Sequence, residues 1–133
     1  MSFSIYLHFP GTCEEALTYY AKLMDGEPGE VFRYRGSPAE DMAPGGNLDL
    51  VMHMRITVGG TILMGSDVSP ERYEKPAGVN VSYASADPEQ AKRVFDALSE
   101  GGEVNMPFEP TFWAKGFGMV TDRFGVPWMV NCD

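Results

Sequence analysis

Two histidines and one arginine stand in strand-like runs of this sequence where their side chains can reach a ligand: His8, His53 and Arg55. An arginine side chain offers a planar fork of N–H donors to a carboxylate, and a histidine side chain gains or loses a proton near neutral pH. Both residue types suit a small organic ligand with an anionic or carbonyl end. Whether they act together depends on the elements that carry them.

A β-hairpin is predicted around Gly59-Gly60, which separates two β-prone segments, residues 50–58 and 61–66. Two glycines supply the positive φ angles of a two-residue turn at no steric cost. Such a turn pairs residues whose numbers sum to 119, and paired residues lie on the same face of the sheet. The predicted pairs are Val58 with Thr61, Arg55 with Met64 and His53 with Ser66.

The first strand is predicted at residues 4–9, where Ile5, Leu7 and Phe9 alternate with Tyr6 and His8. A helix follows at once. Thr12 and Glu15 have the spacing of a capping box, and an apolar stripe at helical spacing continues to Leu23, before Asp25-Gly26. If the apolar face of the strand meets the helix, Tyr6 and His8 lie on the other face.

The same pattern returns about 75 residues later, which predicts an internal repeat. A strand at residues 80–85 precedes a helix that begins with Asp87-Pro88 and ends at Gly101-Gly102. A second hairpin is predicted around residues 122–125. Each half therefore reads as strand, helix and three strands. Residues 36–47, rich in glycine and proline, are predicted to form a long loop of the kind that is often a lid or partly disordered.

Composition bounds the class of protein. A length of 133 residues suits one domain, and the two cysteines match neither a disulfide scaffold nor a zinc motif. We therefore expect a reduced, cytoplasmic protein. No apolar run approaches the roughly 20 residues that span a bilayer, so no membrane partner is expected. The net charge of −9 repels phosphate backbones, so no nucleic acid partner is expected.

Several motifs together resemble the vicinal oxygen chelate superfamily (glyoxalase, bleomycin resistance and dioxygenase proteins), and within it the PhnB-like, 3-demethylubiquinone 3-methyltransferase-like branch. The resemblance covers nearly the whole chain. The motifs are Tyr6-Leu7-His8-Phe9, residues 14–20, Val51-Met52-His53-Met54, residues 59–67 and residues 118–131.

This resemblance implies an α+β fold of two tandem βαβββ modules that form a curved mixed sheet around a cleft, with the helices on the outside. It implies one domain over residues 1–133, with module one at about 1–68, a connector at about 69–78 and module two at about 79–133. It also implies a homodimer.

Metal-using members of the superfamily bring one ligand from the first and one from the last strand of each module. The corresponding positions here lie at or near Tyr6, Met64, Val81 and Met129. None suits a hard or borderline divalent ion, which prefers imidazole or carboxylate ligands. We therefore expect no metal site and no cofactor. The register matters, because a slip of one residue exchanges the two faces.

The hypothesis for the site is a pocket for a small-molecule ligand. His8, His53 and Arg55 supply its polar groups, and its apolar walls are Tyr6, Met64, Trp128 and Met129. An alternative interpretation is that the histidines are strand residues without a partner and that Arg55 is a solvated surface residue. Cys13 lies in the first turn of a helix, but Glu14 and Glu15 oppose formation of a thiolate, so it is not expected to be a nucleophile.

Two functions remain open from the sequence. One is metal-free binding of a small aromatic or amphipathic molecule. The alternative is a metal-dependent lyase, isomerase or dioxygenase. Methyl transfer is the weakest candidate, because Phe9-Pro10-Gly11-Thr12 lacks the glycines of a nucleotide-binding loop.

Overall fold

A computed structural model describes all 133 residues of the chain. It contains, in order, β1 (Ile5–Phe9), α1 (Cys13–Leu23), β2 (Glu27–Arg33), the 3₁₀ turns η1 (Glu40–Met42) and η2 (Pro44–Gly46), β3 (Val51–Val58), β4 (Thr61–Asp67), β5 (Val81–Ala84), α2 (Pro88–Ser99), β6 (Glu103–Glu109), β7 (Gly116–Thr121) and β8 (Pro127–Cys132). Neither α1 nor α2 has the length and apolarity needed to span a bilayer.

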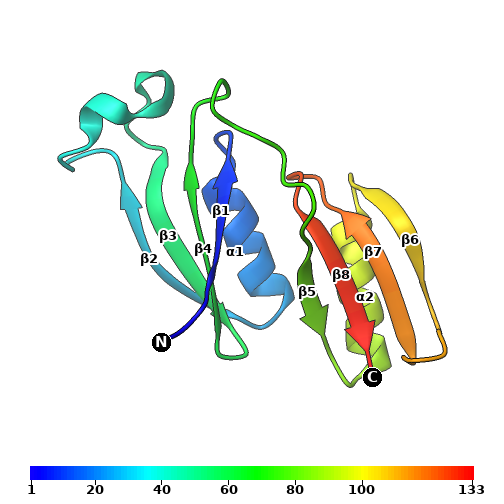
Figure 1. Cartoon of the computed structure of the whole chain (residues 1–133). Helices are drawn as coiled ribbons and strands as arrows, with labels where there is room; N and C mark the ends of the chain where they lie inside the picture. Colours follow the sequence, from blue (N-terminus) through cyan, green and yellow to red (C-terminus); the bar gives the residue numbers. More distant parts are fainter. The chain divides into compact units, whose positions relative to one another are not determined.

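The chain divides into two compact units, a first unit of Met1–Glu74 and a second unit of Lys75–Asp133. Each unit holds one four-stranded mixed sheet and one α-helix (Figure 1). The strand orders are β1-β4-β3-β2 and β5-β8-β7-β6, so the second unit repeats the first strand for strand. The expected tandem βαβββ modules are confirmed.

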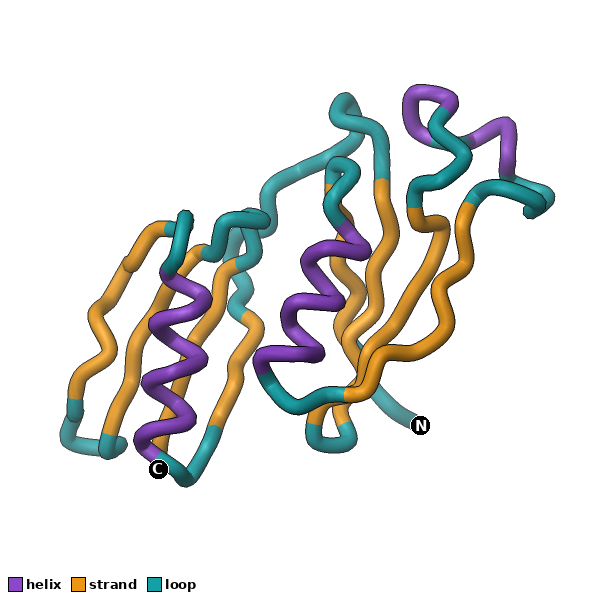
Figure 2. Tube along the Cα trace, turned by 180° about the vertical axis from the view of Figure 1, so that it is seen from behind, coloured by secondary structure: helices purple, strands orange, loops and turns teal.

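In the first unit, β1 runs parallel to β4, and β3 pairs with β4 and β2 in antiparallel fashion. The helix α1 lies along one face of this sheet, as Figure 2 shows. Alternation along the strands sends Phe9, Met54 and Ile56 to that face, where they are buried with Leu17 and Tyr20 of α1. We call the face of this sheet away from α1 the open face.

The second unit is built in the same way. The helix α2 covers one face of its sheet, and Val94, Phe95 and Leu98 of α2 are buried together with Val120 and Val130. Asp87 caps this helix as predicted, since its carboxylate accepts a hydrogen bond from the Glu89 N–H at 3.0 Å.

The expected capping of α1 by Thr12 is wrong, because the Thr12 side chain makes no capping hydrogen bond. The acceptor at the start of α1 is Asp67, which lies at the end of β4, 54 residues after Cys13. Its Oδ1 accepts hydrogen bonds from the backbone N–H groups of Gly11 and Cys13, and its Oδ2 accepts one from Val51 N–H. A single buried carboxylate therefore ties the start of α1 to the start of β3.

Candidate functional site

The open face of the first sheet carries most of the residues that the sequence singled out. Tyr6 on β1 lies opposite Met64 on β4, which lies opposite Arg55 on β3. Residues that pair across neighbouring strands share a face, so these three side chains form one row. His8, two residues beyond Tyr6, lies on the same face, while Leu7 and Phe9 are buried on the α1 side.

The predicted hairpin register is confirmed from Val58–Thr61 to Arg55–Met64. The ladder ends one pair later, at Met54 opposite Gly65, so the predicted pair of His53 with Ser66 does not form part of it. Ser66 instead lies opposite His8, in the ladder with β1.

Four aromatic rings gather on the open face, and we call them the ring cluster: Tyr6, His8, Phe32 and His53. The Tyr6 ring lies 5.3 Å from the ring of His8 and 5.6 Å from that of His53, and it is stacked on the latter at 27°. The Tyr6 hydroxyl oxygen is 3.2 Å from His53 Nδ1. The Phe32 ring lies 6.4 Å from the His53 ring. Aromatic pairs favour these distances.

The ring cluster is open to solvent, with Tyr6 41% and Phe32 45% exposed. Large exposed aromatic side chains that touch one another are more informative than isolated ones, because a contiguous apolar patch on a protein surface commonly marks a binding site.

Phe32 was not identified from the sequence. It lies on β2 opposite His53, but the β2–β3 ladder contains register shifts around residues 28–33, so the pattern of the sequence did not fix its partner.

Arg55 lies on the same open face, on β3 opposite Met64. Its side chain is exposed and makes no hydrogen bond or ion pair within the chain. Gly29 on β2 lies against it, since a Cβ atom at this glycine would be 2.9 Å from Arg55 Cγ and 2.9 Å from the Arg55 carbonyl oxygen. A larger residue at position 29 would therefore displace the arginine stem and its backbone.

The two remaining predicted wall residues, Trp128 and Met129, belong to the second unit. They do not share a face, because neighbouring residues of a strand point to opposite sides. Trp128 is 2% exposed, and its indole N–H donates a hydrogen bond to Asp122 Oδ2 at 2.9 Å. The expectation that Trp128 walls a ligand pocket is therefore wrong, since its ring belongs to the core of the second unit. Met129 is half-buried on the other face.

Asp122 stabilises the β7–β8 turn, which lies where the second hairpin was predicted, around residues 122–125. Its Oδ1 accepts hydrogen bonds from the N–H groups of Phe124 and Val126 in addition to the indole bond at Oδ2. The carboxylate is 6% exposed. With both oxygens engaged in one turn, it is a structural group.

The donor set at the superfamily's metal positions does not fit a divalent ion. Tyr6 and Met64 lie opposite each other as expected, but Met129 lies opposite Ser82, while Val81 lies opposite Trp128. Ser82, next to Val81, is therefore the residue of β5 that shares a cross-strand pair with Met129. Tyr6, Met64 and Met129 carry a phenol and two thioethers, and β5 offers the alkyl group of Val81 or the hydroxyl of Ser82, whereas such ions prefer imidazole and carboxylate. No group of three or more His, Cys, Asp and Glu side chains lies close enough together to hold a metal ion.

Cys13 is buried, and the pKa of its thiol is raised well above its ordinary value by burial, with smaller contributions from the charges of Asp67 and Glu14. The thiolate is the reactive form of cysteine. A raised thiol pKa therefore argues against a nucleophile at this position.

The same fold is found in the crystal structure of a glyoxylase/bleomycin resistance protein/dioxygenase domain from Frankia, which is 9% identical with a TM-score of 0.64, over 99% of this chain and 96% of that one. A sequence model of the 3-demethylubiquinone-9 3-methyltransferase family matches residues 1–131. The chain belongs to this PhnB-like family, and the resemblance drawn from its motifs is confirmed.

Relatives match the chain over its whole length. Protein YjdN of Escherichia coli K12 is 35% identical over 139 aligned residues, which cover 98% of this chain and 95% of that protein. The crystal structure of protein PA1353 from Pseudomonas aeruginosa is 42% identical with a TM-score of 0.90, and the match covers 100% of this chain and 98% of that one. The PhnB protein from Bacillus cereus is 24% identical with a TM-score of 0.86 and full coverage of both chains.

The family's description implies S-adenosylmethionine, but the β1–α1 connection does not fit a nucleotide-type cofactor. Such cofactors bind to free backbone N–H groups at a glycine-rich helix start. Here the N–H groups of Gly11 and Cys13 are already bonded to the Asp67 carboxylate. Together with the lack of a second and third glycine, this engagement argues against methyl transfer at this loop.

Proposed function

We propose that the chain binds a small aromatic carboxylate, without a metal, on the open face of the first sheet. The observation that carries this proposal is the ring cluster next to an exposed guanidinium that has no partner. Stacking on the rings holds the apolar part of the ligand, and the Arg55 fork binds its carboxylate.

The spacing on the strand supports this division of roles. His53 and Arg55 lie two residues apart on β3, which corresponds to about 7 Å along the strand. A ring that stacks beside His53 can therefore extend a carboxylate toward the guanidinium. No internal ion pair has to break first, so the full strength of a charge-assisted hydrogen bond is available to the ligand.

The metal-dependent lyase, isomerase or dioxygenase has no comparable support. It would need ligands outside the superfamily's positions, and no cluster of suitable side chains offers them. Elemental analysis of protein purified without chelators or a metal-affinity tag tests this point. A stoichiometric metal that resists dialysis would contradict the metal-free proposal.

Isothermal titration calorimetry with benzoate, benzyl alcohol and acetate tests the proposal directly. We expect benzoate to bind at least tenfold more tightly than either of the other two, because only benzoate engages both the rings and the guanidinium. Arg55→Gln should weaken benzoate binding about tenfold or more, while benzyl alcohol binding stays unchanged. Phe32→Ala should weaken both aromatic ligands.

Arg93→Gln is the matched control. Arg93 is an exposed arginine on α2, and its loss removes the same charge from the protein. Equal losses of benzoate affinity in Arg93→Gln and Arg55→Gln would show that affinity depends on the net charge of the protein rather than on contact with Arg55. No saturable binding of benzoate to the wild-type protein would refute the proposed ligand class.

A further inference from the structure

A second candidate site lies in the first unit, away from the ring cluster. It is a pocket of about 390 Å³ between the loop of residues 36–47 and the start of the connector after β4. This volume falls in the range of small-molecule sites, about 300–1,000 Å³. The lining residues are Tyr34, Asp41, Met42, Ala43, Pro44, Gly45, Val68, Ser69 and Arg72.

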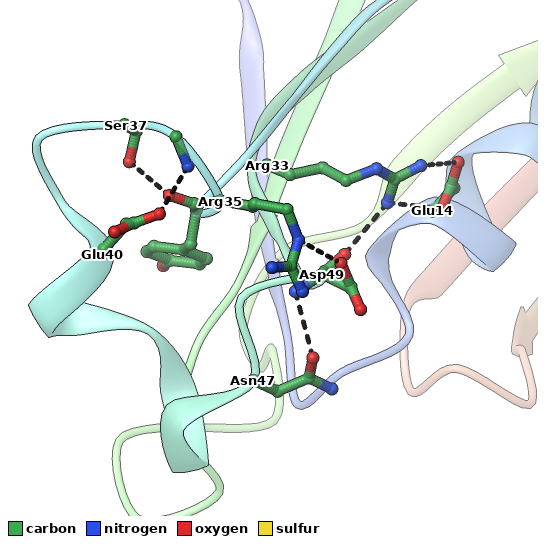
Figure 3. Close-up of polar contacts among 9 residues, drawn as sticks. Glu14, Arg33, Arg35, Ser37, Glu40, Asn47 and Asp49 are labelled. Carbon is green, nitrogen blue, oxygen red and sulfur yellow. Dashed lines mark hydrogen bonds and ion pairs between the residues drawn. The ribbon is translucent and has the colours of Figure 1, made fainter.

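The loop wall of this pocket is held by a polar network, drawn in Figure 3. The Arg35 guanidinium donates to Asp49 Oδ1 at 2.9 Å, which joins the two ends of the loop. Within the loop, Ser37 Oγ donates to the Tyr34 carbonyl at 2.7 Å, and Glu40 Oε2 accepts from Gly36 N–H at 2.6 Å. The loop, expected to be a lid or partly disordered, thus contains two 3₁₀ turns, and its two ends are joined by the Arg35–Asp49 pair.

The opposite wall is equally well tied to the sheet. Val68 N–H donates to the Phe9 carbonyl at 2.7 Å, and the Tyr34 hydroxyl donates to the Asp67 carbonyl at 3.1 Å. The connector then folds into a turn in which the N–H groups of Arg72 and Tyr73 both donate to the Ser69 carbonyl. Both walls are therefore preorganised, which reduces the entropy cost of binding.

Two side chains of opposite charge line this pocket and do not form an ion pair with each other. Asp41 comes from the loop wall and Arg72 from the connector wall. The side chain of neither residue makes an ion pair or a hydrogen bond, and the Ser69 hydroxyl also has no partner. The remaining lining is mostly apolar, with Met42, Pro44 and Val68.

We propose that this pocket binds a free α-amino acid with an apolar side chain. The Arg72 guanidinium and the Ser69 hydroxyl bind its carboxylate, the Asp41 carboxylate binds its ammonium group, and Met42 and Val68 contact its side chain. A fork of guanidinium donors matches a carboxylate, and a carboxylate matches an ammonium group.

The charge balance favours a zwitterion over a singly charged ligand. A simple carboxylate would leave Asp41 without a partner, and an amine would leave Arg72 without one. Only a zwitterion forms a charge-assisted hydrogen bond with both residues.

An NMR titration of the ¹⁵N-labelled full chain tests the proposal. The probes are L-leucine, L-valine and L-methionine, with two matched analogues of leucine: 4-methylpentanoate lacks the ammonium group, and isopentylamine lacks the carboxylate. We expect saturable shifts of the backbone signals of residues 41–45 and 68–72 with at least one amino acid. Each analogue, and the dipeptide Leu-Leu with its separated charges, should bind at least tenfold more weakly.

Variants assign the contacts. Arg72→Gln and Asp41→Asn should each weaken binding at least tenfold. Glu71→Gln should leave it within about twofold of the wild type, because Glu71 is an exposed neighbour in the same turn that does not line the pocket. Both substituted residues are exposed, so thermal unfolding of these variants should match the wild type.

Three outcomes would overturn the proposal: no saturable shifts with any of the amino acids up to about 10 mM, equal binding of a singly charged analogue, or undiminished binding in both charge variants. The test is independent of the proposed function. Arg55→Gln, which is expected to weaken benzoate binding on the open face, should leave amino acid binding intact, so either site can fail alone.

Discussion

Replacing Asp67 by asparagine is expected to lower the free energy of unfolding of the first unit by about 2–5 kcal/mol. The carboxylate is 1% exposed and accepts three backbone N–H groups, from Gly11 and Cys13 at one oxygen and from Val51 at the other. Asparagine has the same shape, but one of its two terminal atoms carries two N–H donors and no acceptor. Whichever way the amide turns, at least one buried N–H faces another donor.

The magnitude follows from these contacts. With the amide oxygen turned toward Gly11 and Cys13, the Val51 N–H loses its partner, which costs about 1–3 kcal/mol. The two remaining hydrogen bonds change from a charged to a neutral acceptor and lose roughly half their strength. Their combined loss is about 1–2 kcal/mol after relaxation of the surroundings.

Urea unfolding followed by two probes checks this prediction. Far-UV circular dichroism reports on both units, whereas tryptophan fluorescence reports on the second unit only, since Trp113 and Trp128 are the two tryptophans of the chain. Alkylation of Cys13, located by mass spectrometry, reports opening of the first unit. We expect Asp67→Asn to speed alkylation of Cys13 at low urea.

Asp96→Asn is the control for this substitution. Asp96 is exposed on α2 and pairs with Lys92, and such surface pairs contribute less than about 1 kcal/mol. A loss below about 1 kcal/mol in Asp67→Asn, or one no larger than in Asp96→Asn, would refute the role of the buried carboxylate as the tie between α1 and β3.

Four further predictions concern stability, reactivity and assembly. Gly118→Ala should lower the free energy of unfolding by about 1–3 kcal/mol, because the added Cβ would lie 2.6 Å from the Phe95 ring and 2.9 Å from Phe108 Cα. An unchanged midpoint of chemical unfolding would contradict the close packing of α2 on β7. The pKa of the Cys13 thiol is raised above its ordinary value of 9.0, so its contribution to stability is complete below pH 9 and is lost as the pH rises above it. The urea midpoint should therefore fall more steeply above pH 9 in the wild type than in Cys13→Ala, and parallel curves would argue against it. Arg33→Gln removes a bidentate ion pair with Glu14, in which the Arg33 and Glu14 side chains are 38% and 47% exposed. The free energy of unfolding should fall by less than about 1 kcal/mol, and by less still at high salt. A larger loss that is insensitive to salt would show that the pair is more than a surface contact. For the expected homodimer, sedimentation at micromolar concentration should give twice the 14.6 kDa mass of the chain, and a monomer mass would count against it.

Several features of the fold could be predicted from the sequence because they depend on local chemistry. The positive φ angles of Gly59 and Gly60 fix a two-residue turn, and this turn fixes the register that pairs Arg55 with Met64. Strand alternation then places Tyr6 and His8 on one face of the sheet and the apolar residues of β1 on the other. The recurrence of cap, stripe and glycine stop identified the repeat, and motifs identified the family.

Other features follow from contacts between residues far apart in the sequence. Thr12 has the right type and spacing for a cap, but the carboxylate bonded to the start of α1 is that of Asp67, which accepts the Cys13 N–H from 54 residues away. The irregular β2 register brings Phe32 beside His53, and strand alternation alone does not give the register across such shifts.

The sequence by itself determined the elements, their order, the faces of the regular strands and the family, because hydrophobic periodicity and turn chemistry are local properties. Only the tertiary structure decided that Trp128 turns inward to Asp122 and that Asp41 and Arg72 line one pocket. The last two lie in segments without periodicity, where the path of the backbone depends on long-range hydrogen bonds rather than on the neighbouring residues.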